Sequence, residues 1–220
     1  MRKTLRNNGL LIVNLALFAI FLIGMSLAGG RDYNADQLAH HEAAISFWRY
    51  LSTGAFVEAV FENWESEFLQ MGSYVVLTAY LFQRGSSESK PIDEAAPQDA
   101  DPRDADLRKP VPWPVRKGGV VLKLYENSLA VFFFVLFFLS ILLHAMGGAK
   151  AYSEEQVAHG DSAVSTWQYL MTSRFWFESL QNWQSEFLAV ACIVGGSVYL
   201  RQRGSPESKP VAEPHMSTGT

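Results

Sequence analysis

The stretch Asn63-Trp64-Glu65-Ser66-Glu67-Phe68-Leu69 decides the fold of this chain, because it occurs twice. It returns as Asn182-Trp183-Gln184-Ser185-Glu186-Phe187-Leu188, an offset of 119 residues from position 63 to position 182. The same offset, without a gap, matches other positions, among them Tyr33 with Tyr152, Trp48 with Trp167, and Glu88-Ser89-Lys90-Pro91 with Glu207-Ser208-Lys209-Pro210. An ungapped repeat of this length predicts that one unit has been duplicated in tandem.

Each copy opens with an apolar run that is long enough to cross a membrane. Residues 10–28 and 129–146 carry no Asp, Glu, Lys or Arg, and a helix of about 20 residues spans the hydrocarbon core. A secretory signal peptide is the alternative interpretation of the first run, because Ser26-Leu27-Ala28 resembles a cleavage site. The second run lies in mid-chain, where no signal peptide occurs. We therefore predict two retained spans, at about 10–28 and 128–146.

A second span is predicted in each copy, at about 64–82 and 183–200. Neither segment contains proline, and both follow an acidic and aromatic stretch that would lie at the membrane boundary. The sequence therefore predicts an all-α membrane protein with four transmembrane helices, formed by tandem duplication of a two-helix unit.

The segments between the paired spans have helical periodicity. Apolar residues from Leu38 to Trp48 recur at intervals that place them on one helix face. Gly29-Gly30 would end the preceding span, since glycine commonly follows a helix C-terminus. We predict two amphipathic interfacial helices on the outer side of the membrane, at about 35–51 and 154–170.

The central segment 85–123 differs in composition, because it holds six of the nine prolines and an acidic run. This composition predicts a disordered linker between repeats at 9–84 and 127–203, and the tail 204–220 is predicted to be flexible. All but four of the 18 Lys and Arg residues lie in or next to the segment 1–8, the linker or the tail. By the positive-inside rule, these three parts and both termini are expected to be cytoplasmic.

The composition also limits the function classes. A formal net charge of −4 is not the basic footprint of nucleic-acid binding, so no nucleic-acid partner is expected. The single cysteine, Cys192, excludes an internal disulfide and any zinc motif built on cysteine pairs. Because no nucleophile–base set, phosphate loop or cofactor motif occurs in the sequence, we expect no cofactor, no metal and no enzymatic activity.

The repeated motif supplies the candidate functional residues. The second spans are short, so Glu67 and Glu186 would lie below the outer membrane boundary, where an ionised carboxylate is costly unless it finds a donor, water or a proton. The two acids would then meet across a pseudo-twofold axis and bind a proton or cation, or alternatively stabilise the surface helices. The full candidate set is Asn63, Trp64, Ser66, Glu67, Asn182, Trp183, Ser185 and Glu186.

Two histidines, His40 and His159, are secondary candidates because the repeat pairs them. Glu42 and Asp161 follow them two residues later, which suggests metal binding, but a metal site needs further ligands at a fixed geometry. A solvated helix face is the simpler interpretation.

The motifs resemble those of a family of small bacterial four-transmembrane proteins of unknown function. The resemblance is carried by Tyr33-Asn34 with Gln37, by residues 61–71, and by Gln83-Arg84-Gly85-Ser86. It implies a multi-pass protein of the bacterial cytoplasmic (inner) membrane, and it implies no activity, catalytic residue or ligand. The second copy departs from the pattern at Gln181 and Gln184, where the first has Glu62 and Glu65, so the copies are not equivalent.

The sequence favours a non-enzymatic structural or interaction component with an aromatic and acidic outer cap. Its partners would be membrane lipids and either another membrane protein or a second copy of this chain. The alternative is a small transporter or a proton- or ion-conducting component that uses Glu67 and Glu186. The small number of polar residues inside the predicted spans disfavours that alternative.

Overall fold

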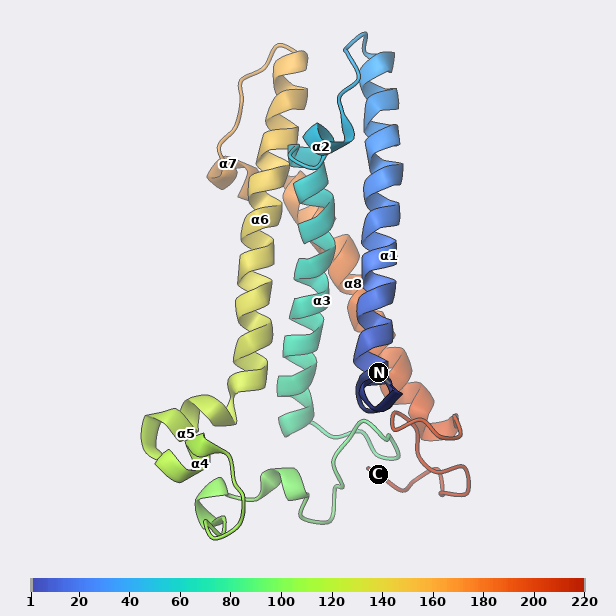
Figure 1. Ribbon diagram of the computed structural model, residues 1–220, viewed down its shortest axis with the longest axis vertical. Coiled ribbons are helices and arrows are strands. Elements are labelled where there is room, and N and C mark those ends of the chain that lie inside the picture. The colour runs from blue at the N-terminus through green and yellow to red at the C-terminus, as the bar shows by residue number, and fades with distance from the viewer. Residues whose placement is uncertain (1, 220) are drawn as a thin grey trace. The chain divides into compact units, whose positions relative to one another are not determined.

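The computed structural model describes residues 2–219, and the side chains of residues 5–219. The predicted all-α class is confirmed, because no strand occurs among these residues. Figure 1 shows the long and short helices in chain order. They are α1 (Arg2–Ala39), α2 (Phe47–Tyr50), α3 (Gly54–Tyr80), η1 (Pro97–Asp99), η2 (Pro102–Asp104), α4 (Trp113–Lys117), α5 (Gly119–Glu126), α6 (Ser128–Ala158), α7 (Thr166–Leu170) and α8 (Ser173–Tyr199).

Two helices are long and apolar enough to cross a membrane, α1 over Leu5–Ala39 and α6 over Ser128–Ala158. Their most apolar windows are only 6% and 22% buried inside the protein. A core helix of a soluble protein would bury its apolar side chains, whereas here Leu10 and Phe21 are 81% and 69% exposed. The two helices are therefore candidate membrane spans.

The chain divides into two compact units. The first unit contains residues 1–61 and 143–172, and the second contains residues 62–142 and 173–220. The first unit therefore holds α1, α2, α7, the start of α3 and the end of α6. The second holds α4, α5, α8 and the remaining parts of α3 and α6.

The segments that follow α1 and α6 differ from the single amphipathic helices predicted at 35–51 and 154–170. Instead, α1 continues to Ala39 and α6 to Ala158, and each is followed by a loop and a short helix, α2 or α7. The same change corrects the predicted ends of the first spans. Gly29 and Gly30 lie inside α1 and do not end it.

Helices α1 and α6 end in the same backbone motif, and this motif explains why they stop at Ala39 and Ala158. After α1, the Glu42 N–H donates to the Gln37 carbonyl at 2.8 Å, and the His41 N–H donates to the Leu38 carbonyl at 3.2 Å. After α6, Asp161 and Gly160 repeat these bonds to Gln156 and Val157 at 2.9 and 3.0 Å. This is the Schellman arrangement, whose turning residue takes a left-handed conformation. His41 has φ 62° and Gly160 has φ 86°.

His41 is strained relative to its counterpart, because a left-handed conformation costs a residue with a Cβ atom more than it costs glycine. We expect His41→Gly to raise the free energy of unfolding by about 0.5–1 kcal/mol, since the added flexibility of the unfolded chain offsets part of the gain. The measurement is thermal unfolding in detergent micelles. Gly160→His is the reciprocal control and should lower stability; an unchanged midpoint for both variants would refute the explanation.

A polar side chain near the end of each of these two helices forms hydrogen bonds with the backbone of the loop that follows. The Asn34 amide accepts from the Ile45 N–H at 2.8 Å and donates to the Ile45 carbonyl at 2.9 Å. The Ser153 hydroxyl makes the equivalent pair of bonds with Val164 at 2.9 and 3.1 Å. Asn34 thus bonds a residue 11 positions further along the chain.

Two tyrosines fill notches that glycines leave in the long helices of the first unit. Tyr50 lies against Gly29 and Gly30, and Tyr169 lies against Gly148 so closely that an added Cβ would overlap either ring. A second tyrosine flanks each ring: the Tyr33–Tyr50 and Tyr152–Tyr169 centroids are 5.6 and 5.7 Å apart. The glycines therefore admit an aromatic side chain at helix positions where any larger residue would exclude it.

The second unit contains the segment predicted to be a disordered linker, 85–123. Here η1, η2 and α4 each have proline within their first turn, a position where its missing N–H removes no helical hydrogen bond. Helix α5 begins at Gly119, inside the predicted linker, and packs against α4. Asn127 separates α5 from α6 with φ −112° and ψ 7°, and Asn8 interrupts α1 with similar angles.

Candidate functional site

The repeated motif forms a hydrogen-bonded contact between α3 and α8 in the second unit. The Asn182 amide donates to the Glu62 carboxylate at 2.6 Å, and the Trp183 indole N–H donates to the Glu65 carboxylate at 3.3 Å. One turn further along, the Gln70 amide donates to the Glu186 backbone carbonyl at 3.3 Å. The acids of the first copy thus meet side-chain donors of the second copy.

This contact is shielded from its surroundings. Glu65 is 0% exposed and Ser66 is 2% exposed. Trp183 lies among aromatic rings, with its centroid 6.1 Å from that of Phe137 and 6.3 Å from that of Trp176. A buried carboxylate is stable only where donors replace water, and the indole N–H of Trp183 is such a donor.

The predicted serines and the first-copy residues of the motif have local roles. The Ser66 and Ser185 hydroxyls donate to the carbonyls of Asn63 and Asn182 at 2.7 and 2.8 Å, within their own helices. Asn63 is exposed. The ring of Trp64 packs edge-on against Phe68 of the same helix. Of the eight predicted residues, Asn182 and Trp183 make the side-chain contacts between α8 and α3 described above.

The paired acids Glu67 and Glu186 lie close enough for their charges to interact. Glu67 is exposed and Glu186 is partly buried. The exposure of Glu67 distinguishes it from the buried Glu65. A proton or cation shared by the two paired carboxylates stays a prediction.

Glu62 and Glu65 are not among the candidate residues predicted from the sequence, although both lie in or next to the motif. The reason was symmetry: the second copy has Gln181 and Gln184 at these positions. That departure from the repeat was itself the signal. An acid that occurs in one copy only can pair with a donor of the other copy, as Glu62 and Glu65 do.

The first unit contains a separate polar cluster, which was not predicted from the sequence. The Tyr169 hydroxyl donates to the Glu58 carboxylate at 3.0 Å. A ring nitrogen of His144 lies within 4.8 Å of a Glu58 oxygen, and both His144 and Tyr169 are 0% exposed. The residue equivalent to His144 in the first copy is Met25, so the repeat does not draw attention to this histidine. A histidine inside an otherwise apolar run was the available signal.

The secondary candidates His40 and His159 are on exposed helix ends. Each ring Nδ1 lies near a carbonyl of its own helix, that of Asp36 at 3.0 Å and that of Glu155 at 2.8 Å. Within residues 5–219, neither histidine belongs to a group of side chains spaced to hold a metal ion. The arrangement is that of a solvated helix end.

Two further acids that the repeat pairs, Glu88 and Glu207, approach each other past the end of α3. The Tyr74 hydroxyl donates to the Glu88 carboxylate at 2.6 Å. Burial raises the pKa of Glu88; the Tyr74 hydrogen bond lowers it, and the nearby Glu207 carboxylate raises it. The net effect is a pKa above the ordinary value.

This raised pKa predicts the sign of a pH effect. An acid that binds its proton more tightly when folded adds stability below its ordinary pKa, and that stability is lost as the pH rises through the folded pKa. We therefore expect Glu88→Gln to be more stable than wild type at pH 7, by no more than about 1 kcal/mol. The difference should shrink towards pH 4.5. Thermal unfolding between pH 4 and pH 8 tests this, with the exposed Glu94→Gln as control.

Comparison with known proteins adds one match. A family model described as a domain of unknown function (DUF6766) matches residues 1–220. No curated protein and no solved structure matches the chain.

Proposed function

Because the chain belongs to the DUF6766 family over its whole length, and this family's description states no activity, we propose a function from the side chains of this chain. We propose a four-span integral membrane protein of the bacterial cytoplasmic membrane that acts as a non-enzymatic structural or interaction component. Its outer aromatic and acidic segments would bind a membrane-protein partner or a second copy.

Four spans and a tandem duplication are supported by features that recur at the 119-residue offset. Helices α3 and α8 are each 27 residues long, or about 40 Å, and begin and end at equivalent positions. The Schellman ends, the tyrosine notches and the asparagine breaks recur at the same offset. A bilayer that contains α1 and α6 would also accommodate α3 and α8, whose polar side chains pair with each other.

The observation that carries the structural role is the pairing of Glu62 with Asn182 and of Glu65 with Trp183. Inside a membrane, hydrogen bonds between helices hold them together where the hydrophobic effect does not. Residues used in this way fix the distance between two helices. They are not available to a passing substrate, which favours a scaffold over a transport path at this point.

The outer surface offers large aromatic side chains for a partner. Trp48 is 78% exposed and Trp167 is 70% exposed, at equivalent positions of the two repeats. Tryptophan is enriched both at binding hot spots and at membrane interfaces. A photo-crosslinking residue at Trp48 or Trp167, incorporated in living cells, should yield one adduct of defined mass. The same residue at Leu10 should yield none; equal labelling at all three positions would contradict a specific partner.

The proposed orientation leads to a labelling prediction. In a Cys192→Ser background, Ala43→Cys should react with a membrane-impermeant thiol reagent in intact cells. Glu94→Cys should react only after the membrane is permeabilised, because the positive-inside rule places this segment in the cytoplasm. The measurement is the mass shift of the labelled protein on a gel. Labelling of Glu94→Cys in intact cells would reverse the topology.

Proton or cation conduction is the second candidate, favoured by the proximity of Glu67 to Glu186 and of Glu88 to Glu207. These two pairs and the Tyr74 hydroxyl all lie in the second unit. Flux in proteoliposomes under an imposed gradient decides between the candidates. Conduction predicts flux that Glu67→Gln with Glu186→Gln abolishes without unfolding the protein. The structural role predicts no flux from well-folded wild type.

A further inference from the structure

The repeat ends in two equivalent loops, Gln83-Arg84-Gly85-Ser86 and Gln202-Arg203-Gly204-Ser205, whose arginines have different surroundings. In the first loop, an Arg84 guanidinium nitrogen lies 3.9 Å from a carboxylate oxygen of Asp93. The position equivalent to Asp93 in the second copy is Ala212. The first copy therefore pairs its arginine with a carboxylate, whereas no ion pair at Arg203 occurs among residues 5–219; the acid next to Ala212, Glu213, lies near Lys209 instead.

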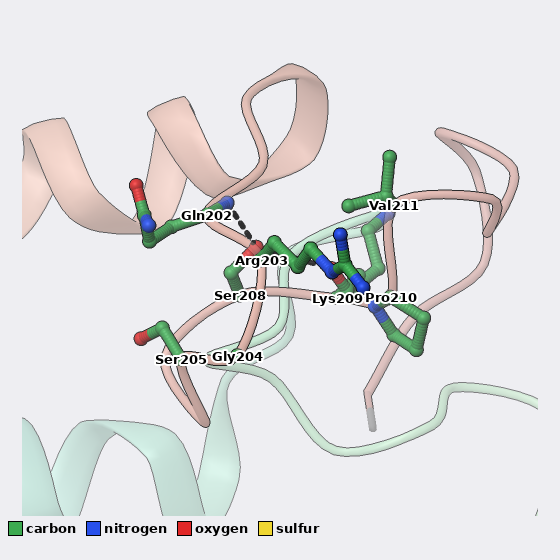
Figure 2. A pocket seen from close by; sticks show the side chains of 8 residues that line it. All are labelled: Gln202, Arg203, Gly204, Ser205, Ser208, Lys209, Pro210 and Val211. Atoms are coloured by element: carbon green, nitrogen blue, oxygen red, sulfur yellow. Dashed lines mark hydrogen bonds between the residues drawn. The ribbon is translucent and has the colours of Figure 1, made fainter.

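Arg203 instead borders a pocket of about 610 Å³, which Figure 2 shows with its lining side chains. Gly204 has φ 85°, and this left-handed turn folds the loop back on itself. The Gln202 N–H donates to the Ser208 hydroxyl at 2.9 Å, and the Glu207 N–H donates to the Ser205 hydroxyl at 3.2 Å. The loop that lines the pocket is thus held in shape by hydrogen bonds between its own residues.

A second cation, Lys209, lines the same pocket but is committed to the tail. Its ammonium group donates to the carbonyls of Pro214, His215 and Ser217 at 3.3, 2.8 and 2.8 Å, and the residue is 1% exposed. It adds positive potential to the pocket without reaching a ligand. Arg203 is therefore the cation that can contact one.

The C-terminal end of α8 carries a cation that would reduce its repulsion of a nearby anion. The carbonyls at a helix C-terminus carry partial negative charge and would repel one. Here the Arg201 guanidinium donates to the carbonyls of Ser197, Val198 and Leu200 at 3.0, 3.2 and 2.8 Å, which offsets that charge. The equivalent residue of the first copy is Phe82, so this cap belongs to the second copy only.

This inference rests on the proposed four-span arrangement, in which the apolar side chains next to the pocket would lie at a membrane boundary. Leu200, at the end of α8, is 71% exposed, and Val211, which lines the pocket, is 63% exposed. A cation beside exposed apolar groups at the end of a span fits the region where lipid phosphates lie.

We propose that this pocket binds a phosphate group through Arg203, and that its ligand is the phosphate of an anionic lipid headgroup. In the first copy, the Asp93 carboxylate takes the place of that phosphate, since it pairs with the equivalent arginine, Arg84. The chain would then hold one bound lipid per molecule, although two equivalent arginines are present.

The test is native mass spectrometry of the full chain in a zwitterionic detergent, with added phosphatidylglycerol. Wild type should retain one lipid. Arg203→Gln should weaken binding about tenfold, because one charge-assisted contact is lost. The matched control Arg84→Gln should bind like wild type. Ala212→Asp should also lose the lipid, since it supplies the second copy with its own carboxylate.

Asp93→Ala gives the complementary gain, because it removes the carboxylate that pairs with Arg84 and should raise the number of retained lipids from one to two. Equal binding by the Arg203→Gln and Arg84→Gln variants, both with wild-type circular dichroism, would overturn the proposal. Inorganic phosphate distinguishes the two sources of the ligand. If millimolar phosphate displaces the lipid from wild type but phosphatidylcholine does not, the site is a phosphate site open to soluble anions. If phosphate has no effect, the lipid is the ligand.

Discussion

Replacing Gly54 with alanine is expected to lower the free energy of unfolding by about 2–3 kcal/mol, the usual cost of overpacking a tight contact. Gly54 opens α3 and lies against α6 in the first unit. A Cβ atom at this position would be 2.6 Å from both the Gly147 carbonyl oxygen and the Ala151 nitrogen. Both are backbone atoms, which cannot rotate away as a side chain can. The two helices would have to separate.

Gly195→Ala is the matched control for this prediction. It lies inside α8, where an added Cβ meets nothing within 4 Å. Alanine is about 1 kcal/mol better than glycine in a helix interior, so this variant should be slightly more stable than wild type. Thermal unfolding in detergent micelles, with both variants reconstituted identically, measures the difference. Similar midpoints for the two variants would show that α3 and α6 are not in backbone contact at Gly54.

The second large effect is expected at Trp183. Trp183→Phe keeps an aromatic ring beside Phe137 but removes the N–H that donates to the buried Glu65 carboxylate. Loss of a hydrogen bond to a buried charged group costs about 1.5–3 kcal/mol. Trp167→Phe, at a position 70% exposed, controls for the loss of a tryptophan and should change little.

A double-mutant cycle separates this hydrogen bond from packing. Glu65→Leu alone removes the acceptor, and Glu65→Leu combined with Trp183→Phe replaces both partners by apolar groups. Because removing both partners is far less costly than removing one, the double variant should recover most of the stability lost by Trp183→Phe. If the double variant instead loses the sum of the stability lost by the two single variants, Trp183 acts through its ring and not through its N–H.

The helices that the sequence identifies best are those defined by local pattern. The apolar runs in α1 and α6 and the proline-free segments in α3 and α8 all form helices. The errors lie where a distant partner decides the structure. The bonds of Asn34 and Ser153 to residues 11 positions away end the predicted amphipathic helices. Gly29 was interpreted as a helix end because its partner, Tyr50, cannot be seen from local sequence.

The candidate site shows the same division. The repeat drew attention to Asn182 and Trp183, whose donor groups the structure brings to α3. Their acceptors, Glu62 and Glu65, were omitted because a symmetry argument retains only what both copies share. Which residues face each other depends on how two helices are rotated against one another. A pattern along one helix does not contain that information.

The one-way pairing between the copies has a consequence for how such a chain could arise. The first copy holds both the acids, Glu62 and Glu65, and the asparagine and tryptophan of the motif, so two identical copies of it could form an isologous dimer with every bond made twice. The second copy, with Gln181 and Gln184, has kept only the donors. In the proposed tandem duplication, the joining of two copies would remove the need for each half to serve both sides of a symmetric interface. The halves of this chain are therefore complementary and no longer interchangeable.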